Sequence, residues 1–348
     1  MFDNIYVFYI LLKYKLSLIT RLELFGKFRE YVKSKGPVFV KLLQIFLLNQ
    51  YKFGDDFSEE EINELSQILD KVNYHINDAD FDVGCGSVAY VYFDKDDRTK
   101  VIKKIIPNIE DEIISSTNEF KTICNTAKLL INLPYDEKGI DCYQDLLLNQ
   151  VNLEKEALNM IKMKNIIEDN YIKVPTVYEY NKDMIKMEYI KGYKLTDFLK
   201  KFPEKELECK SLLKCLLENM IENKFIHGDL HEGNFLFNFN EKNNVIVNVI
   251  DFGIVFEITD KQKNIFNNYI FNKCKGELKK HNKYLFYYEL TNKKIPFEIF
   301  KNHYHQYKSK DFFVLLDKFK EINVELDYYL VTFIIGLHNL KVRLDSMK

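Results

Sequence analysis

The sequence predicts an α+β fold in which an N-terminal helical extension (residues 1–78) precedes a small β-rich lobe (79–190) and a helical lobe (191–348). Three observations predict this order. Apolar residues of the first segment recur at helical spacing, strand-like runs concentrate in the second, and leucine-rich helical spacing dominates the third. No internal repeat or low-complexity linker interrupts the chain, so we expect one compact body with an extension.

Composition narrows the classes of function. The chain has 348 residues, 47% of them hydrophobic, and its 50 basic and 52 acidic side chains give a formal net charge of −2. This balance lacks the basic excess of proteins that bind a nucleic-acid backbone, so nucleic acid is not an expected partner. The six cysteines form no paired CxxC spacing, which favours a reducing, intracellular compartment over a disulfide framework or zinc site.

Two apolar stretches bear on membrane contact. The runs 5–12 and 328–340 are shorter than the roughly 20 residues that a spanning helix needs, and the first follows Asp3 where a signal peptide would carry positive charge, so no signal peptide is expected. Both are therefore expected to be packing helices and not transmembrane helices. Peripheral membrane contact by either end of the chain stays open.

The extension is expected to contain two amphipathic helices. Gly36-Pro37 predicts the start of the first, because proline's missing N–H is not needed in the first turn of a helix. Lys41 and Gln44 lie three residues apart in this helix and share one face. A capping box at 58–61 predicts the start of the second helix, which ends near residue 73.

The second segment begins with alternating strand-like runs around a glycine loop, and a long helical stretch follows Pro107. Strands are expected at residues 81–83, 88–93, 100–106, 177–180, 184–189 and 245–250. The last of these is the only strand expected in the third segment.

The clearest chemical signal is the segment His227–Asn234, followed after a short apolar strand by Asp251-Phe252-Gly253. Phosphoryl transfer needs an Asp on a loop, an Asn five residues later and a second Asp after a strand. Asp229 would accept or orient the proton of the attacking hydroxyl, while Asn234 and Asp251 would offer oxygen ligands to magnesium. Gly233 and Gly253 are expected to give the backbone the freedom for tight turns.

Two other interpretations of this segment were weighed. A polar loop before a buried strand would explain each short motif alone, but not their joint order and spacing. His227 and His231 also stand four apart like a helical zinc pair, but Gly228 and Gly233 disfavour a helix there.

The strand after the glycine loop supplies the expected cation for the nucleotide phosphates, Lys103. Lys104 is the alternative, although alternation along a strand points it to the opposite face. The carboxylate expected to pair with this lysine is Glu156, with Glu154 and then Glu119 as competitors.

The remaining nucleotide contacts are expected from the glycine loop and from a hinge that precedes Gly192. The residues expected to bind nucleotide are Gly84, Cys85, Gly86, Ser87, Val88, Met187, Glu188 and Tyr189.

Taken together, these motifs resemble those of the UbiB-type (coenzyme-Q-associated, AarF-domain) atypical protein kinase family. Residues 36–44 resemble its GPxFxKxGQ segment, 153–159 its EAxN helix, 174–178 and 187–192 its VPxVY and MExxxG motifs, and 227–234 its HxDxHxGN loop. The resemblance implies a two-lobed protein-kinase-like fold and binding of ATP and Mg²⁺. It also implies a regulatory role for Lys41 and Gln44.

Several positions depart from the pattern of that family. Leu43 replaces a glycine, 150–152 lacks the usual acidic residues, and Gly84, Cys85 and Gly86 stand where alanines are characteristic. A glycine loop lets backbone amides approach phosphates more closely, which favours ordinary phosphotransfer over ATPase-like behaviour.

The sequence thus predicts a kinase-like enzyme that transfers phosphate or hydrolyses ATP, with an acceptor that is a protein, a lipid or a small molecule. A link to quinone or lipid metabolism is implied only by the resemblance. Two alternatives remain: a small-molecule kinase of the aminoglycoside or choline kinase type, and a pseudokinase scaffold that binds nucleotide without turnover.

Overall fold

A computed structural model describes residues 2–48, 83–130, 137–167, 171–230, 232–271 and 276–289, together with positions 60, 169, 291, 296, 298–299 and 301–302. The expected helix at 58–73, the expected strand at 81–83 and the apolar run 328–340 lie outside these residues, apart from Glu60 and Val83. The contacts group the chain into two compact units. Unit 1 holds the described residues up to Tyr90 and from Ile105 to Val151, and unit 2 holds 91–104 and the described residues from Asn152 onward. The division into an extension and two lobes stays a prediction.

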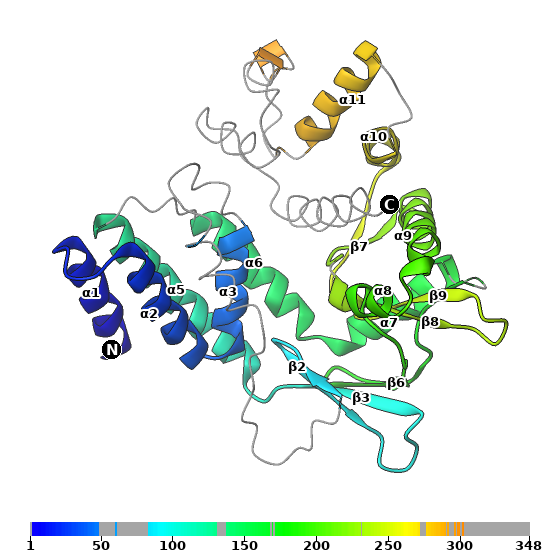
Figure 1. Ribbon diagram of the computed structural model, residues 1–348, viewed down its shortest axis with the longest axis horizontal. Coiled ribbons are helices and arrows are strands. Elements are labelled where there is room, and N and C mark those ends of the chain that lie inside the picture. The colour runs from blue at the N-terminus through cyan, green and yellow to red at the C-terminus, as the bar shows by residue number, and fades with distance from the viewer. Residues whose placement is uncertain are drawn as a thin grey trace. The chain divides into compact units, whose positions relative to one another are not determined.

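Unit 1 is a group of helices. Its elements are α1 (Phe2–Lys15), α2 (Arg21–Ser34), α3 (Pro37–Leu48), the short β1 (Gly84–Cys85), α5 (Ile109–Leu130) and α6 (Glu137–Gln150). In Figure 1, α1, α2 and α3 lie beside the long α5. The buried ring of Phe39 meets that of Phe120 edge-on, with centroids 5.6 Å apart, so α3 and α5 share a core.

The turn between α2 and α3 confirms the predicted helix start. Gly36 has a φ of 94°, a left-handed conformation that suits glycine, and Pro37 begins α3 directly after it. Lys35, just before this turn, forms an ion pair of 2.8 Å with Glu119 of α5, and the Tyr31 hydroxyl also donates to Glu119.

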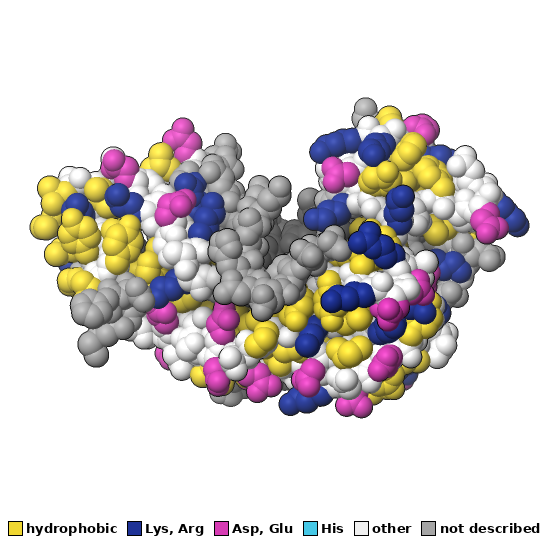
Figure 2. All heavy atoms as spheres, turned by 90° about the horizontal axis from the view of Figure 1, so that it is seen from below, with side chains coloured by type: hydrophobic (Ala, Val, Ile, Leu, Met, Phe, Trp, Pro, Cys, Tyr) yellow, Lys and Arg dark blue, Asp and Glu magenta, His cyan; other side chains and the backbone are white. Residues whose placement is uncertain are grey.

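Helix α1 has two apolar stripes, one buried and one exposed to solvent. Val7, Ile10 and Leu11 are buried, whereas a second stripe on the same helix is exposed. The exposed stripe, which we call the α1 outer stripe, consists of Ile5, Phe8, Tyr9 and Leu12. Figure 2 shows hydrophobic side chains gathered on the surface over α1 and α2. Within the described part of the chain, no helix is long and apolar enough to cross a bilayer.

Unit 2 begins with an antiparallel sheet in the order β2-β3-β6-β5. Its strands are β2 (Ala89–Phe93), which enters from unit 1, β3 (Lys100–Ile105), β5 (Val177–Tyr180) and β6 (Met184–Glu188). Helix α7 (Leu153–Ile167) packs against β5 and β6. The register pairs Lys103 with Ile185, which places this lysine in the middle of the sheet.

The rest of unit 2 is mainly helical but contains more strands than expected. Its helices are α8 (Leu195–Lys201), η3 (Pro203–Lys205), α9 (Glu206–Glu222), η4 (Glu232–Asn234), α10 (Asp260–Ile270) and α11 (Gly276–Glu289). Its strands are β4 (Ile172–Lys173), β7 (Phe225–His227), β8 (Phe235–Phe239), β9 (Val245–Val249) and β10 (Val255–Glu257).

The expectation of a single strand beyond residue 191 is therefore wrong. The three additional strands there have only three to five residues, too few to show an alternating pattern against the neighbouring helices. Their hydrogen bonds come from antiparallel pairing: β7 pairs with β10, which is distant in sequence, and β8 forms a hairpin with β9.

Candidate active site

These two antiparallel pairs bring the three residues of the phosphoryl-transfer motif together. The β7–β10 register sets His227 opposite Val255, and the β8–β9 register sets Phe235 opposite Val249. The loops that follow β7, precede β8 and follow β9 must therefore meet at one end of these strands. The Ile250 N–H donates to the Asn234 carbonyl over 3.0 Å, which confirms this closeness.

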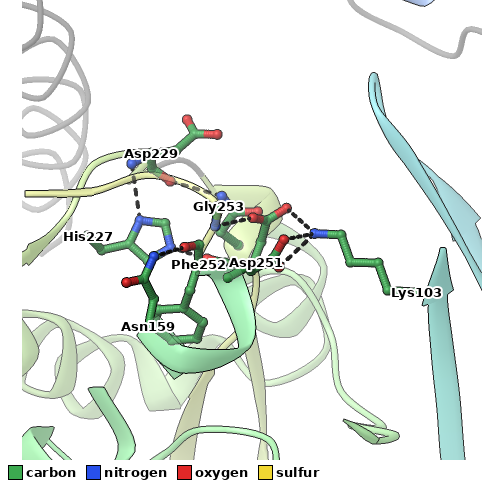
Figure 3. A network of polar contacts seen from close by, with 9 residues as sticks. Lys103, Asn159, His227, Asp229, Asp251, Phe252 and Gly253 are labelled. Carbon is green, nitrogen blue, oxygen red and sulfur yellow. Dashed lines mark hydrogen bonds and ion pairs between the residues drawn. The ribbon is translucent and has the colours of Figure 1, made fainter. Parts of the chain in front are cut away.

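Lys103 lies in this site, and its partner is the expected Glu156. The Lys103 ammonium donates to both Glu156 carboxylate oxygens over 2.7 and 2.9 Å, and it lies 3.4 Å from Asp251 Oδ2 (Figure 3). Lys103 is buried and Lys104 is exposed, as the alternation along β3 predicts. Neither competitor fits the pairing role, because Glu154 is exposed and Glu119 is occupied by Lys35 and Tyr31.

Charge interactions tune the ionisation of this cluster. Burial alone would lower the pKa of Lys103, but the carboxylates of Asp251 and Glu156 outweigh burial and raise it. The Asp251 side chain is half exposed, and its partial burial would raise its pKa, but the Lys103 ammonium and the Gly253 N–H hold the pKa below its usual value. Burial raises the pKa of Glu156, an effect that Lys103 opposes. Because the ammonium donates two short hydrogen bonds to the Glu156 carboxylate, the Lys103–Glu156 pair is ionised.

His227 links the two acidic loops. It is fully buried, its Nδ1 accepts from the Asp229 N–H over 3.1 Å, and its Nε2 lies 2.5 Å from the Asp251 carbonyl oxygen (Figure 3). A carbonyl can only accept, so the proton must be on Nε2, and Nδ1 is the unprotonated acceptor. The neutral imidazole thus fixes the backbone at both aspartates.

Asn234 is oriented for an oxygen ligand. Its side chain is buried, and its Nδ2 donates to the Asp229 carbonyl over 2.9 Å, so the amide oxygen is the atom that a cation would meet. Asp251 stands beside it with a carboxylate that the neighbouring ammonium keeps ionised. Among the residues that the structure describes, no cluster of three or more His, Cys, Asp or Glu side chains could hold a metal ion. His231, of the zinc interpretation, lies outside them.

The tight turn at Asp251 differs from expectation. Among the described residues, Gly36 is the only glycine with a left-handed φ, so neither Gly233 nor Gly253 uses this freedom. Asp251 itself adopts it, with a φ of 66°. The Gly253 N–H donates to Asp251 Oδ1 over 3.1 Å, and such a local bond makes this conformation accessible to an aspartate.

The hinge segment lies in the sheet of unit 2, and two of its amides already have partners. The Glu188 N–H donates to the Thr176 carbonyl over 2.9 Å, and the Tyr189 N–H donates to the Thr99 carbonyl over 2.8 Å. Met187 pairs with Val101 in the β3–β6 register. An adenine ring bound at this hinge segment would therefore have to pair with backbone groups other than the N–H groups of Glu188 and Tyr189.

The other expected nucleotide residues and the regulatory pair lie in unit 1. In the glycine loop the Gly86 N–H donates to the Ala89 carbonyl over 2.8 Å, and Val88 is buried. Lys41 lies half-buried on α3, and Gln44 is on the same helix with a side chain outside the described residues. The structure therefore brings together Lys103, Glu156, Asp229, Asn234 and Asp251, and it does not relate the loop or Lys41 to them.

Asn159, the Asn of the EAxN-like segment, is a residue of the site to which the sequence assigned no role. Its Nδ2 donates to the Phe252 carbonyl over 3.0 Å (Figure 3). Its position three residues after Glu156, on the same face of α7, is the signal that could have found it.

Comparison with known proteins places this geometry in context. Residues 60–285, more than half of the chain, match the family model described as the ABC1 atypical kinase-like domain.

Among curated proteins, the chain is 24% identical over 272 residues to "Probable protein kinase UbiB" of Shewanella piezotolerans (strain WP3 / JCM 13877), covering 67% of the chain and 48% of that protein. The protein of the same name from Histophilus somni (strain 129Pt) is 24% identical over 268 residues, with the same coverage. The chain thus spans about half the length of these curated relatives.

Solved structures give weaker matches. The Rv3197–erythromycin complex from Mycobacterium tuberculosis aligns with a TM-score of 0.44 at 18% identity, covering 65% of the chain and 59% of that protein. The Rio2 kinase–ADP/Mg²⁺–phosphoaspartate complex from Chaetomium thermophilum aligns with a TM-score of 0.32 at 13% identity, covering 57% and 59%.

Proposed function

Since the chain belongs to the ABC1 atypical kinase-like family, with its kinase-like α+β fold, we propose that it is an ATP- and magnesium-dependent phosphotransferase or ATPase. The observation that best supports this proposal is the Lys103–Glu156 pair beside Asp251. A buried lysine held by one carboxylate and facing a second is arranged to receive phosphate oxygens, since it cannot turn away into solvent.

The donor set fits Mg²⁺. This ion prefers carboxylate and amide oxygens and keeps several of its waters, and Asp251 and Asn234 would supply one oxygen ligand each. When bound, Mg²⁺ would neutralise charge on the β- and γ-phosphates.

In this mechanism, each side chain of unit 2 has a separate task. Lys103 holds the α- and β-phosphates, and Glu156 fixes the ammonium in position. Asp229 accepts or orients the proton of the attacking hydroxyl or water. His227 keeps the backbone of both aspartates in place through its two ring nitrogens. We further propose that loop residues 84–88 contact the nucleotide and that Lys41 and Gln44 have a regulatory role.

The acceptor is tested by following labelled phosphate. Purified protein is incubated with γ-labelled ATP and Mg²⁺ alone, with a generic protein substrate, with anionic-lipid vesicles, with a phenolic quinone-precursor mimic, and with aminoglycosides or choline. We expect Mg²⁺-dependent release or transfer of the γ-phosphate, and the labelled product identifies the acceptor class. Label in an aminoglycoside or choline would favour the small-molecule kinase. Nucleotide binding without turnover in any condition would contradict the proposal and favour the pseudokinase scaffold.

We also propose peripheral contact of α1 with a membrane surface. Each of the four large apolar side chains of the α1 outer stripe is 38–57% exposed. A contiguous exposed apolar stripe of this kind is typical of a surface that contacts a membrane or a partner. Lys13 and Lys15 end the helix, and Lys13 lies over the Tyr9 ring at 4.5 Å. Apolar and aromatic side chains beside lysines suit the interface of an anionic bilayer.

Vesicle sedimentation tests this contact. Wild type should sediment with anionic vesicles, less at high salt, and the double variant Phe8→Asp/Leu12→Asp should stay in the supernatant. Leu207→Asp, which changes a leucine of unit 2 that is more exposed than Phe8 or Leu12, should sediment like wild type. Equal sedimentation of all three proteins would show that the stripe does not contact the bilayer.

A further inference from the structure

The backbone at Asp251 must be held by its surroundings. Its φ of 66° lies in the left-handed region, which residues other than glycine rarely occupy unless neighbouring groups stabilise it. Because the carboxylate direction follows from this backbone conformation, the groups that hold the turn also set where the carboxylate points.

Two of these groups come from the loops of the site itself. The His227 ring bonds to the Asp251 carbonyl, and the Gly253 N–H bonds to Asp251 Oδ1. Neither contacts the Phe252 carbonyl, which lies in the peptide group that follows and on which the end of the turn depends.

Helix α7 supplies that contact. Asn159 Nδ2 donates to the Phe252 carbonyl over 3.0 Å, and Glu156 Oε1 accepts a longer bond of 3.4 Å from the Phe252 N–H. The two residues lie three apart and therefore on the same face of the helix. The backbone on both sides of Phe252 is thus tied to the helix that carries the partner of Lys103.

Burial makes the Asn159 bond important. The Phe252 side chain is fully buried, and its ring lies 5.3 Å from that of His227, so the turn is packed against the core of unit 2. A buried carbonyl that loses its donor is unfavourable, and the turn would then move to find another partner.

We propose that Asn159 is a positioning residue for Asp251: through the Phe252 carbonyl it holds the turn so that the Asp251 carboxylate lies beside Lys103 and can receive Mg²⁺. Asn159 touches neither nucleotide nor metal in this arrangement. The inference rests on the proposed function, because it assigns Asp251 the metal.

Nucleotide binding with and without metal tests the proposal independently of turnover. The dissociation constant of a fluorescent ATP analogue is measured in Mg²⁺ and in EDTA. Wild type should bind more tightly in Mg²⁺. In Asn159→Ala, this Mg²⁺-dependent gain in affinity should be about 10-fold smaller than in wild type, while the affinity in EDTA should be unchanged. If the alanine variant does not fold, Asn159→Leu replaces it in the test: leucine fills the space without a donor, and the same loss of the Mg²⁺-dependent gain is expected. Asn159→Gln, which retains the amide, should recover part of the gain.

Asn152 provides the matched control. Its Oδ1 accepts from the Lys155 N–H at the start of α7, so Asn152→Ala removes a helix cap without touching the turn at Asp251. We expect a lower melting temperature and an unchanged Mg²⁺-dependent gain.

The outcomes separate this inference from the proposed function. If wild type shows the gain and Asn159→Ala and Asn159→Leu keep it, or if Asn152→Ala loses it equally, Asn159 has no positioning role. If wild type binds no nucleotide, the proposed function fails and the inference fails with it.

Discussion

Replacing Lys103 with methionine is expected to reduce ATP turnover by about 100-fold or more, whereas Lys104→Met should leave it unchanged. The two lysines are adjacent on β3, but only the Lys103 ammonium contacts Glu156 and Asp251. Losing a fixed charge that meets developing charge in a transition state typically costs about 10²–10³-fold in rate. Phosphate release at saturating Mg²⁺ and ATP measures the effect, and equal turnover of the two variants would contradict the role of Lys103.

The same substitution has a stability effect with a distinct dependence on pH. Lys103→Met leaves Glu156, with only 2% of its side chain exposed, without its cation, and breaking such a pair costs about 3–5 kcal/mol. Burial already raises the pKa of Glu156, and losing the ammonium raises it further.

A raised carboxyl pKa in the folded state means that the folded protein binds more protons than the unfolded protein. The variant should therefore be closest to wild type at acidic pH and lose stability as the pH rises through the ordinary range of a glutamate. The double variant Lys103→Met/Glu156→Met should recover stability at neutral pH but not turnover. Failure to recover stability would show that the single variant was destabilised by something other than the unpaired carboxylate.

Gly228→Ala is expected to destabilise unit 2 strongly and to abolish turnover. A Cβ at this position would lie 2.3 Å from Phe256 Cε2 and 2.4 Å from Ile254 Cγ2, both far inside van der Waals contact. Overpacking of this kind typically costs about 1–3 kcal/mol. Because the Gly228 N–H also donates to the Ile254 carbonyl, relief of the clash must displace the loop that carries Asp229.

Gly84→Ala is the matched control for stability. A Cβ on Gly84 meets no atom within 4 Å, so the same chemical change should leave the melting temperature unchanged. The measurement is thermal unfolding of wild type and both variants under identical conditions. If the Gly228→Ala protein has the same melting temperature as wild type, β7 and β10 can separate to admit a methyl group.

The local chemistry of the site was largely predictable from the sequence. The choice of Lys103 over Lys104 follows from the alternation of side chains along a strand. The choice of Glu156 follows from its place on a helix between the strand that carries Lys103 and the strand 184–189. The structure brings both together with Asp251. The resemblance to UbiB-type atypical kinases is confirmed by the match to the family model.

Features that depend on distant partners were not predictable. Strands β7, β8 and β10 are too short to show a period, and the site depends on the pairing of β7 with β10, which sets His227 opposite Val255, and on the hairpin of β8 with β9. The left-handed backbone also could not be read from composition, because it falls on Asp251 while the expected Gly253 supplies an N–H instead. Asn159 lies in the EAxN-like segment, but its role could not be predicted from the sequence because it is a bond to a backbone carbonyl distant in sequence.

We propose that this site in unit 2 transfers the γ-phosphate of ATP with Asp229 at the reacting hydroxyl. Mg²⁺-dependent γ-phosphate release by wild type and by Asp229→Asn tests this role, with nucleotide binding measured on the same samples. We expect equal nucleotide binding and a loss of about 10²–10⁴-fold in turnover for the variant, the usual contribution of a positioned general base. Wild type and variant that bind ATP equally and release phosphate at the same rate would contradict it.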